Sequence, residues 1–337
     1  MPSDLRLVFM GTPEFAVASL DAILQADYNV VAVITAPDKL AGRGMQLTES
    51  AVKKFAVAKG IAVLQPDKLK DPVFQAQLRA LNADLQVVVA FRMLPESVWN
   101  MPRMGTVNLH GSLLPQYRGA APINWAVING ESETGVTTFQ LQQDIDTGSI
   151  LLQDRFAIAD TDTAGDVHDR MKVIGARLLV KTIDGLAAGT LVGVPQQNPP
   201  ELKHAPKIFT ETCRIDWNKS TVEIYNLIRG LSPFPAAFTE LDGKVLKIFR
   251  SEKEMRPVGA AADLPAAKLP VNEPPPASPL PTPGTTHAPG AHDTDGKTWL
   301  RFATPDGFIR VTELQLEGKK KMAVGDFLRG YRFPANS

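Results

Sequence analysis

The chain has 337 residues, 36 basic and 36 acidic side chains, and therefore no net formal charge, while 44% of its residues are hydrophobic. This length predicts about two domains, and the hydrophobic content excludes a globally disordered chain. The balanced charge argues against a protein that coats nucleic acid through bulk electrostatics, although it leaves room for local basic patches.

Targeting and metal signals are missing from the sequence. No apolar run approaches the roughly 20 residues of a membrane helix, and Asp4 stands where a signal peptide needs positive charge. We therefore expect a cytoplasmic protein without a membrane partner. The single cysteine, Cys213, excludes an internal disulfide, and we interpret it as a bystander rather than a nucleophile. The five histidines lack metal-ligand spacing, so we expect no metal.

Through about residue 190, short apolar runs alternate with helical patterns, beginning with a strand whose following turn offers Thr12 as N-cap and Pro13 as first helical residue. This alternation predicts an α/β domain with a Rossmann-like, mainly parallel sheet covered on both faces. Neither a GxGxxG nor a GxxxxGK[ST] motif is present, so we reject NAD binding and a P-loop. The expected strands are 5–10, 30–35, 61–64, 85–90, 105–109, 136–141 and 150–156, and the expected helices are 15–25, 51–59, 71–81, 121–129 and 164–186.

After a linker at 191–207, the chain changes character. One helix, four strand-like runs and the turn signals Asp242-Gly243 and Asp306-Gly307 predict a small β-barrel or sandwich over 208–337. Residues 255–296 hold 10 of the 27 prolines and few large apolar side chains, which favours a flexible insertion of no inferred function. The expected helix is 222–229, and the expected strands are 237–241, 245–249, 297–302 and 308–316.

The residues most suited to chemistry follow the strand 105–109. Asn108 and His110 share one face of that strand, at the carboxyl end where ligands bind in open α/β sheets. An amide can donate to an oxyanion, and an imidazole can relay a proton near neutral pH. The pair therefore fits acyl transfer, although a buried, fully bonded His110 is an equally simple interpretation.

A carboxylate beside the imidazole would orient the ring and stabilise its protonated form. Asp144 and Asp146 both follow the strand 136–141, and Asp146, directly before Thr147-Gly148, is the better candidate. An ordinary tight turn explains the same three residues. Spacing alone therefore supports only an α/β enzyme with a possible acyl-transfer site.

The block 108–115 (NLHGSLLP), followed by 118–123 (RGAAPI), closely resembles the 10-formyltetrahydrofolate-dependent formyltransferases. The resemblance covers most of the chain outside the proline-rich insertion, and its central block is highly specific. The further matching segments are 9–15, 41–44, 133–137, 146–148, 214–217, 227–229, 233–237 and 318–322.

The resemblance implies a formyltransferase domain at 1–190 and an OB-type barrel at 208–337 that helps to hold tRNA. It implies transfer of the formyl group of 10-formyltetrahydrofolate, as co-substrate, to the α-amine of methionine on initiator tRNA, in support of translation initiation. It also implies that Asn108, His110 and Asp146 are the catalytic trio. The residues that it assigns to folate contact are Ser112, Leu113, Leu114 and Pro115.

Two basic segments are candidates for tRNA contact, and solvated surface is the alternative for each. The first contains Lys39 and Arg43 and resembles the family's loop that reaches the acceptor arm, and the second is Lys319-Lys320-Lys321. The chain departs from the family at 90–95, where the loop is shorter and Arg92 stands where many members have glycine. That segment lies near the folate ring in the family, so altered pterin contacts are expected.

Three other functions compete with this interpretation. A glycinamide ribonucleotide formyltransferase has no C-terminal barrel, so residues 208–337 argue against it. Amino-sugar formyltransferases share the HGSLLP block, but they tend to carry a basic residue in the segment where this chain has Ala120-Ala121-Pro122. An RNA-binding protein with an inactive catalytic domain would have no need for the whole trio. We expect a monomer.

Overall fold

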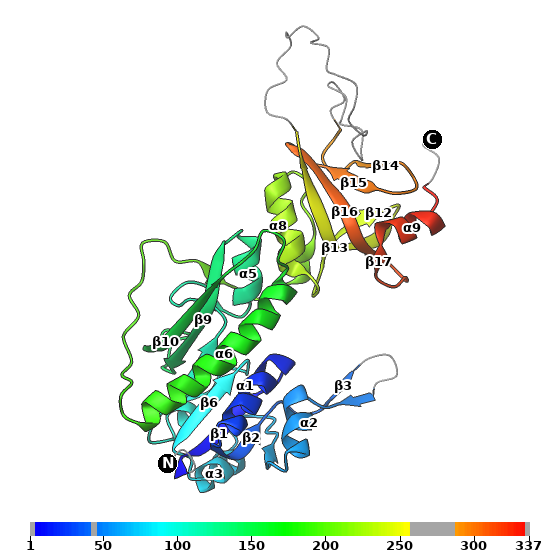
Figure 1. Ribbon diagram of the computed structural model, residues 1–337. Helices are drawn as coiled ribbons and strands as arrows, with labels where there is room; N and C mark the ends of the chain where they lie inside the picture. The colour runs from blue at the N-terminus through cyan, green and yellow to red at the C-terminus, as the bar shows by residue number, and fades with distance from the viewer. Residues whose placement is uncertain (1–3, 42–45, 257–286, 334–337) are drawn as a thin grey trace. The chain divides into compact units, whose positions relative to one another are not determined.

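The computed structural model describes residues 4–41, 46–256 and 287–333 (Figure 1). The chain divides into two compact units, Met1–Phe209 and Thr210–Ser337. Among the described helices, none is both long and apolar enough to cross a membrane.

The first unit is built on a seven-stranded sheet of order β10-β9-β7-β6-β1-β2-β5. The five strands from β7 to β5 are parallel, whereas β9 runs antiparallel to β7 and β10 antiparallel to β9. The predicted mainly parallel sheet is therefore confirmed, with two antiparallel strands at one edge. Its strands are β1 Arg6–Gly11, β2 Asn29–Ile34, β5 Val63–Leu64, β6 Leu85–Val89, β7 Thr106–His110, β9 Glu133–Gln140 and β10 Ile150–Ala157.

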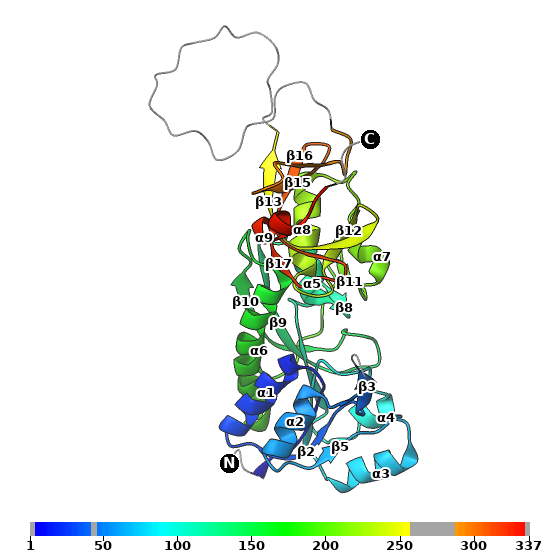
Figure 2. The same ribbon diagram turned by 90° about the vertical axis from the view of Figure 1, so that its right-hand side faces the viewer.

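Helices cover both faces of this sheet (Figures 1 and 2). Alternate side chains of β1 separate accordingly, because Leu7 and Phe9 pack in one buried cluster, and Val8 and Met10 pack in another. The first cluster contains side chains of α1, α2, α5 and α6, and the second contains side chains of α3 and α4. The helices are α1 Glu14–Gln25, α2 Ala51–Ala58, α3 Pro72–Ala80, α4 Glu96–Trp99, α5 Pro122–Ile128 and α6 Ala164–Ala187.

Local signals at the helix starts explain most of these boundaries. Asp71 caps α3 by accepting from Val73 N at 2.7 Å, and a reciprocal capping box of Thr163 and Asp166 begins α6. At α1 the prediction of Thr12 as N-cap is wrong by one residue. Pro13 occupies that position, and it makes no side-chain cap because it has no polar group.

The segment predicted as a linker, 191–207, forms part of the first unit. Val194 bridges Ile150, and the two exchange a pair of backbone hydrogen bonds of 2.8 Å. Further along, β11 (His204–Ala205) pairs in parallel with β8 (Arg118–Gly119), and Ala205 is completely buried. A short hairpin of β3 (Lys39–Ala41) and β4 (Gln46–Thr48), which the hydrophobic pattern did not predict, follows β2.

The second unit is an antiparallel sheet of order β12-β13-β16-β15-β14, which curls into a half-barrel, with β17 paired to β16. At the β12–β13 turn, Asp242 and Gly243 have φ of 49° and 73°, as a two-residue hairpin turn requires. The predicted hairpin is therefore confirmed. The elements are α7 Thr210–Cys213, α8 Thr221–Leu231, β12 Ala237–Leu241, β13 Lys244–Met255, β14 His292–Thr294, β15 Leu300–Ala303, β16 Gly307–Leu316, β17 Met322–Ala323 and α9 Val324–Gly330.

The predicted insertion at 255–296 is only partly covered by the structure. Residues 257–286 lie outside the described residues, whereas the end of the segment forms β14. The ring of His287 contacts Phe308 edge-on, and that of His292 packs near Phe302. The half-barrel sheet therefore includes the end of this segment, which the composition did not predict, and aromatic rings of β15 and β16 contact it.

Candidate active site

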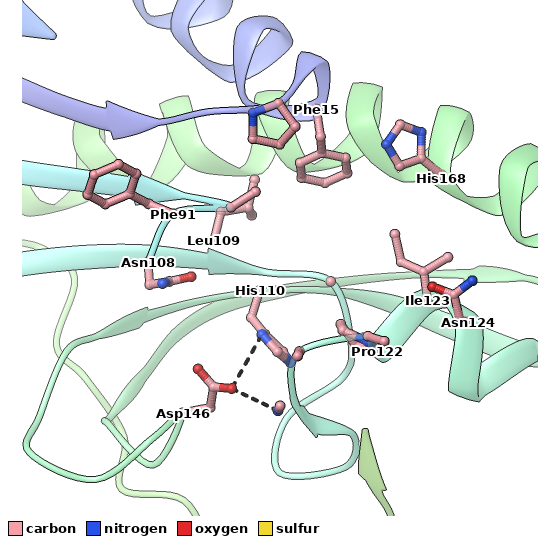
Figure 3. A pocket seen from close by; sticks show the side chains of 16 residues that line it. Phe15, Phe91, Asn108, Leu109, His110, Pro122, Ile123, Asn124, Asp146 and His168 are labelled. Atoms are coloured by element: carbon pink, nitrogen blue, oxygen red, sulfur yellow. Dashed lines mark hydrogen bonds and ion pairs between the residues drawn. The ribbon is translucent and has the colours of Figure 1, made fainter. Parts of the chain in front are cut away.

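A cavity of about 500 Å³ opens at the carboxyl ends of β6 and β7 in the first unit. Asn108, His110 and Asp146 all line it (Figure 3), so the structure brings the three predicted residues together at the strand ends. The remaining lining residues are Pro13, Phe15, Ala90, Phe91, Leu109, Gly111, Gly119, Ala120, Ala121, Pro122, Ile123, Asn124 and His168.

His110, the last residue of β7, is held by two acceptors. The residue is 7% exposed, and its Nε2 lies 2.9 Å from the carbonyl oxygen of Tyr117. Because a carbonyl can only accept, Nε2 carries a hydrogen and donates it. The other ring nitrogen, Nδ1, lies 3.8 Å from Oδ2 of Asp146. Nε2 therefore makes the hydrogen bond that fixes the ring, while Nδ1 faces the carboxylate at a longer distance.

Asp146 reaches the imidazole from the turn after β9. Its φ is 53°, in the left-handed region, and its Oδ2 accepts a 2.9 Å hydrogen bond from Gly119 N, drawn with the His110 contact in Figure 3. Gly148 allows this turn, because an added Cβ would lie 1.7 Å from the carbonyl oxygen of Gln140. Asp144, the other carboxylate considered, is exposed and is not among the residues that line the cavity.

Asn108 lies on β7 two residues before His110 and extends into the same cavity (Figure 3). Its side-chain amide makes no hydrogen bond with the described residues, unlike the imidazole and the carboxylate beside it. Both of its N–H groups are therefore available to a ligand, which is the property that an oxyanion donor needs.

Tyr117 contacts the imidazole of His110 through its backbone carbonyl, and the sequence did not predict this contact. Its φ is 60°, and this turns its carbonyl toward His110. The buried phenol donates to Glu131 and accepts from Asn129 at 3.1 Å. Burial and the hydrogen bond to Glu131 raise the pKa of the Tyr117 phenol above its usual range. In the sequence, only the position of Tyr117 in the loop after His110 pointed to this contact.

The four residues that the resemblance assigns to folate contact lie outside the lining of this cavity. Ser112 is fully buried and donates to Gln116 O at 2.6 Å, and Leu114 N donates to Thr137 Oγ1 at 3.1 Å. Leu113 lines a separate depression beside Glu131, and Pro115 follows Leu114 through a cis peptide bond. None of the four lines the cavity around His110, so their contact with folate stays a prediction.

Arg92, the departure from the family pattern, is turned away from the cavity. Its guanidinium donates to the carbonyls of Pro66 and, at 2.8 Å, of Asp67, and the neighbouring Phe91 lines the cavity. Burial lowers the pKa of the Arg92 guanidinium. Arg92 therefore ties the cavity wall to the segment after β5.

The predicted tRNA-contacting lysines are exposed. Lys39 begins β3, and Arg43 lies outside the described residues. Lys319 and Lys320 are in the turn after β16, and Lys321 Nζ pairs with Glu313 at 2.7 Å. The ammonium of Lys321 also lies 4.9 Å from the centre of the buried Phe249 ring.

Neither Cys213 nor a metal-ligand cluster adds a second candidate site. Cys213 is buried, and burial raises the pKa of its thiol, which disfavours the reactive thiolate. In the described part of the chain, no group of three or more His, Cys, Asp or Glu side chains is arranged to hold a metal ion.

Comparison with known proteins is consistent with this geometry. Residues 5–183 match the formyl transferase family, and residues 207–332 match the formyl transferase C-terminal domain. The chain therefore belongs to the formyl transferase family. Curated relatives named methionyl-tRNA formyltransferase include those of Parabacteroides distasonis, 54% identical over 98% of this chain and 96% of that protein, and Bacteroides fragilis, 52% identical over 97% and 95%.

Solved structures share the fold at low identity. An N-formyltransferase from Helicobacter canadensis, in complex with folinic acid and dTDP-3-aminofucose, has a TM-score of 0.64 and 20% identity over 94% of this chain and 100% of that chain. HypX from Aquifex aeolicus in complex with tetrahydrofolic acid has a TM-score of 0.62 and 17% identity, covering 98% of this chain and 49% of that one. The likeness shows the formyltransferase fold.

Proposed function

We propose that this protein transfers the formyl group of 10-formyltetrahydrofolate to the α-amine of methionine on initiator Met-tRNA. The observation that carries the proposal is the cavity in which Asn108, His110 and Asp146 meet, with the Asn108 amide unengaged. Relatives that are more than 50% identical over nearly the whole chain bear the name of this activity, which supports the choice of acceptor.

The reaction forms a bond between the amine nitrogen and the formyl carbon and breaks the bond between that carbon and N10 of folate. The amine loses a proton, and N10 gains one. Esterification to tRNA lowers the amine's basicity below that of a free α-amine, whose reference pKa is about 8, so much of it is neutral at physiological pH. The chemical difficulty therefore lies in the tetrahedral intermediate and its leaving group.

Asn108 donates a hydrogen bond to the oxyanion of that intermediate. The imidazolium of His110 adds positive charge and relays a proton toward N10 through water, and Asp146 stabilises this charged ring. Since Tyr117 O occupies the hydrogen at Nε2, the proton that is exchanged is the one at Nδ1, on the side of the carboxylate.

Two substrates must approach this trio from different directions. In Figure 3, Phe91 lies at one end of the cavity beside Asn108, and Ile123 and His168 lie at the other, with His110 between them. We assign the Phe91 end to the folate and the opposite end to the aminoacyl group. This arrangement places the formyl carbon beside Asn108 and His110.

The second unit completes the proposal as an OB-type tRNA-binding domain. Lys319 and Lys320 provide exposed positive charge on it beside Lys321, whose ammonium is paired with Glu313, and Lys39 provides such charge on the first unit. Phosphate contacts of this kind lose affinity as salt rises. We propose that the protein acts as a cytoplasmic monomer.

The test is to offer one purified protein three acceptors together with 10-formyltetrahydrofolate. We expect formylation of Met-tRNA and not of an amino-sugar nucleotide or glycinamide ribonucleotide. The His110→Ala variant, purified identically, controls for a contaminating host enzyme. Formylation of the sugar nucleotide alone would replace this proposal with the sugar reaction, and a KM for tRNA that does not rise with salt would remove the lysine assignment.

A further inference from the structure

The turn that carries Asp146 is held by a side chain from the predicted linker. Nε2 of Gln196 lies 2.8 Å from the carbonyl oxygen of Asp146 and 2.8 Å from that of Gly148. The two N–H groups of one amide therefore bridge both sides of the turn. This contact reaches across about fifty residues of sequence.

The other end of the same amide is bound as well. Oε1 of Gln196 accepts from Nε of Arg118 at 3.1 Å and from a terminal nitrogen of the same guanidinium at 2.5 Å. Since arginine only donates and carbonyls only accept, the amide can have only one orientation. Arg118 is further tied to Asn198, whose Oδ1 accepts at 3.0 Å.

Arg118 directly precedes Gly119, whose N–H donates to the Asp146 carboxylate. The loop after His110 thus holds the Asp146 carboxylate directly, through Gly119, and its Arg118 orients the Gln196 amide that holds the Asp146 backbone. Gln196 is itself fixed by the backbone pairing of Val194 with Ile150 in β10.

The hydrogen bonds from Gln196 are needed because the backbone conformation of this turn is unfavourable by itself. Asp146 has a left-handed φ of 53°, which costs a non-glycine residue free energy unless its surroundings impose it. Without the bonds to its backbone carbonyls, the turn can relax, and the carboxylate then moves relative to Nδ1 of His110. The present distance of 3.8 Å already leaves little room for further separation.

We propose that Gln196, oriented by Arg118, is a positioning residue that keeps the Asp146 carboxylate against His110 during formyl transfer. This role rests on the function proposed above for Asp146. It gives the segment 191–207 a part in the chemistry, whereas its sequence suggested only a connection between domains.

Two substitutions test the donated hydrogen bonds. Gln196→Ala removes them, and Gln196→Glu keeps the size and the acceptor for Arg118 but turns an oxygen toward two carbonyl oxygens. We expect both variants to lose about 10- to 10²-fold in kcat, with KM for Met-tRNA and for folate changed less than threefold, since a misplacement of about 1 Å costs up to this much. Gln197→Ala, at the exposed neighbouring glutamine, is the matched control and should keep wild-type kinetics.

Wild-type kcat in Gln196→Glu would overturn the proposal, because that variant keeps the size and the acceptor for Arg118 but has no N–H to donate to the two carbonyls. A rise in KM at unchanged kcat in either variant would also overturn it, as it would show a role in binding. Thermal melting of each variant establishes that the protein assayed is folded, and kcat is taken at a temperature where all are native.

A double-mutant cycle separates this inference from the proposed function. If Gln196 acts through Asp146, then adding Gln196→Ala to Asp146→Ala should lower the single-turnover rate less than about twofold. A full additional loss in that background would contradict the positioning role. Wild-type activity of Asp146→Ala alone would instead refute the catalytic assignment of Asp146, and the inference with it.

Discussion

One polar side chain in each unit, Asn108 in the first and Arg301 in the second, illustrates two different environments. In the first unit, the Asn108 amide faces a cavity and makes no hydrogen bond with the described residues. In the second, the buried guanidinium of Arg301 donates to Asp293 at 2.8 Å and to Glu254 at 3.0 Å, and it lies 4.2 Å from the centre of the Phe308 ring.

These two environments predict which substitutions change the reaction rate and which change the stability of the fold. A fully bonded polar network stabilises a fold, because each group lost leaves a partner unsatisfied. An unengaged polar group in a cavity contributes little to the fold and is available to a substrate. Substitutions in the cavity should therefore change turnover at nearly constant stability, and those in the network of the second unit should do the opposite.

The largest expected effect is that of His110→Ala. Loss of a positioned proton relay should lower kcat by about 10³- to 10⁴-fold. Among the described residues, His110 has the only titratable side chain in contact with Asp146, so no other side chain there can replace it. The measurement is single-turnover formylation, with the melting temperature as a check on folding. His204→Ala, an exposed histidine of β11, is the control. Near wild-type turnover of folded His110→Ala would refute the assignment.

The next effect is that of Asn108→Ala, which should lower kcat by about 10²- to 10³-fold through the loss of one oxyanion donor. Its unfolding free energy should change little, because the amide has no partner to leave unsatisfied. Asn108→Asp retains the shape but cannot donate, so it should be at least as slow. Full activity of Asn108→Asp would show that donation at this position is not used.

The smallest effect on turnover is expected in the second unit, at Asp306. Its Oδ1 accepts from both the backbone N and the hydroxyl of Thr221, at 2.8 Å each, and so satisfies the first backbone N–H of α8, whose N-cap is Ser220. Asp306→Ala should lower the free energy of unfolding of this unit by about 1–2 kcal/mol at pH 7, with kcat unchanged. Asp326→Ala, at an exposed carboxylate paired within α9, is the control.

This stabilisation should also depend on pH. Burial by itself would raise the pKa of Asp306, but the hydrogen bonds from Thr221 and Thr304 outweigh it and lower the pKa below its ordinary value. The contribution is therefore complete above the unfolded-state pKa and is lost as the pH falls through the folded-state value. Urea unfolding of wild type and Asp306→Ala at pH 7 and at acid pH measures this. If the difference in unfolding free energy between the two proteins does not shrink at acid pH, the assigned role is contradicted.

Much of the fold could be predicted from local patterns. β12 (Ala237–Leu241) has the predicted bounds, and α6 and β6 each differ by one residue, because long apolar periods and near-continuous apolar runs are strong local signals. The short elements β8 and β11 were not predicted. Each has two residues and exists only through pairing with a distant segment, so no local pattern marks it.

The sequence likewise predicted only some of the residues of the candidate site. Asn108 and His110 could be paired by the alternation of a single strand, and Asp146 by its turn after a neighbouring strand. Tyr117 and Gln196 could not be found in this manner. Tyr117 reaches His110 through the backbone carbonyl of a residue in the left-handed conformation, and Gln196 reaches Asp146 through an amide near the end of the first unit.

By itself, the sequence determined the order of the longer strands and helices, the mainly parallel sheet and the formyltransferase resemblance, since each depends on neighbouring residues or on a contiguous motif. Tertiary structure alone decided that Arg92 turns out of the cavity, that 191–207 belongs to the first unit and that Gln196 meets Asp146. Those facts depend on distances between segments that are remote in the chain, and packing of the whole unit sets these distances.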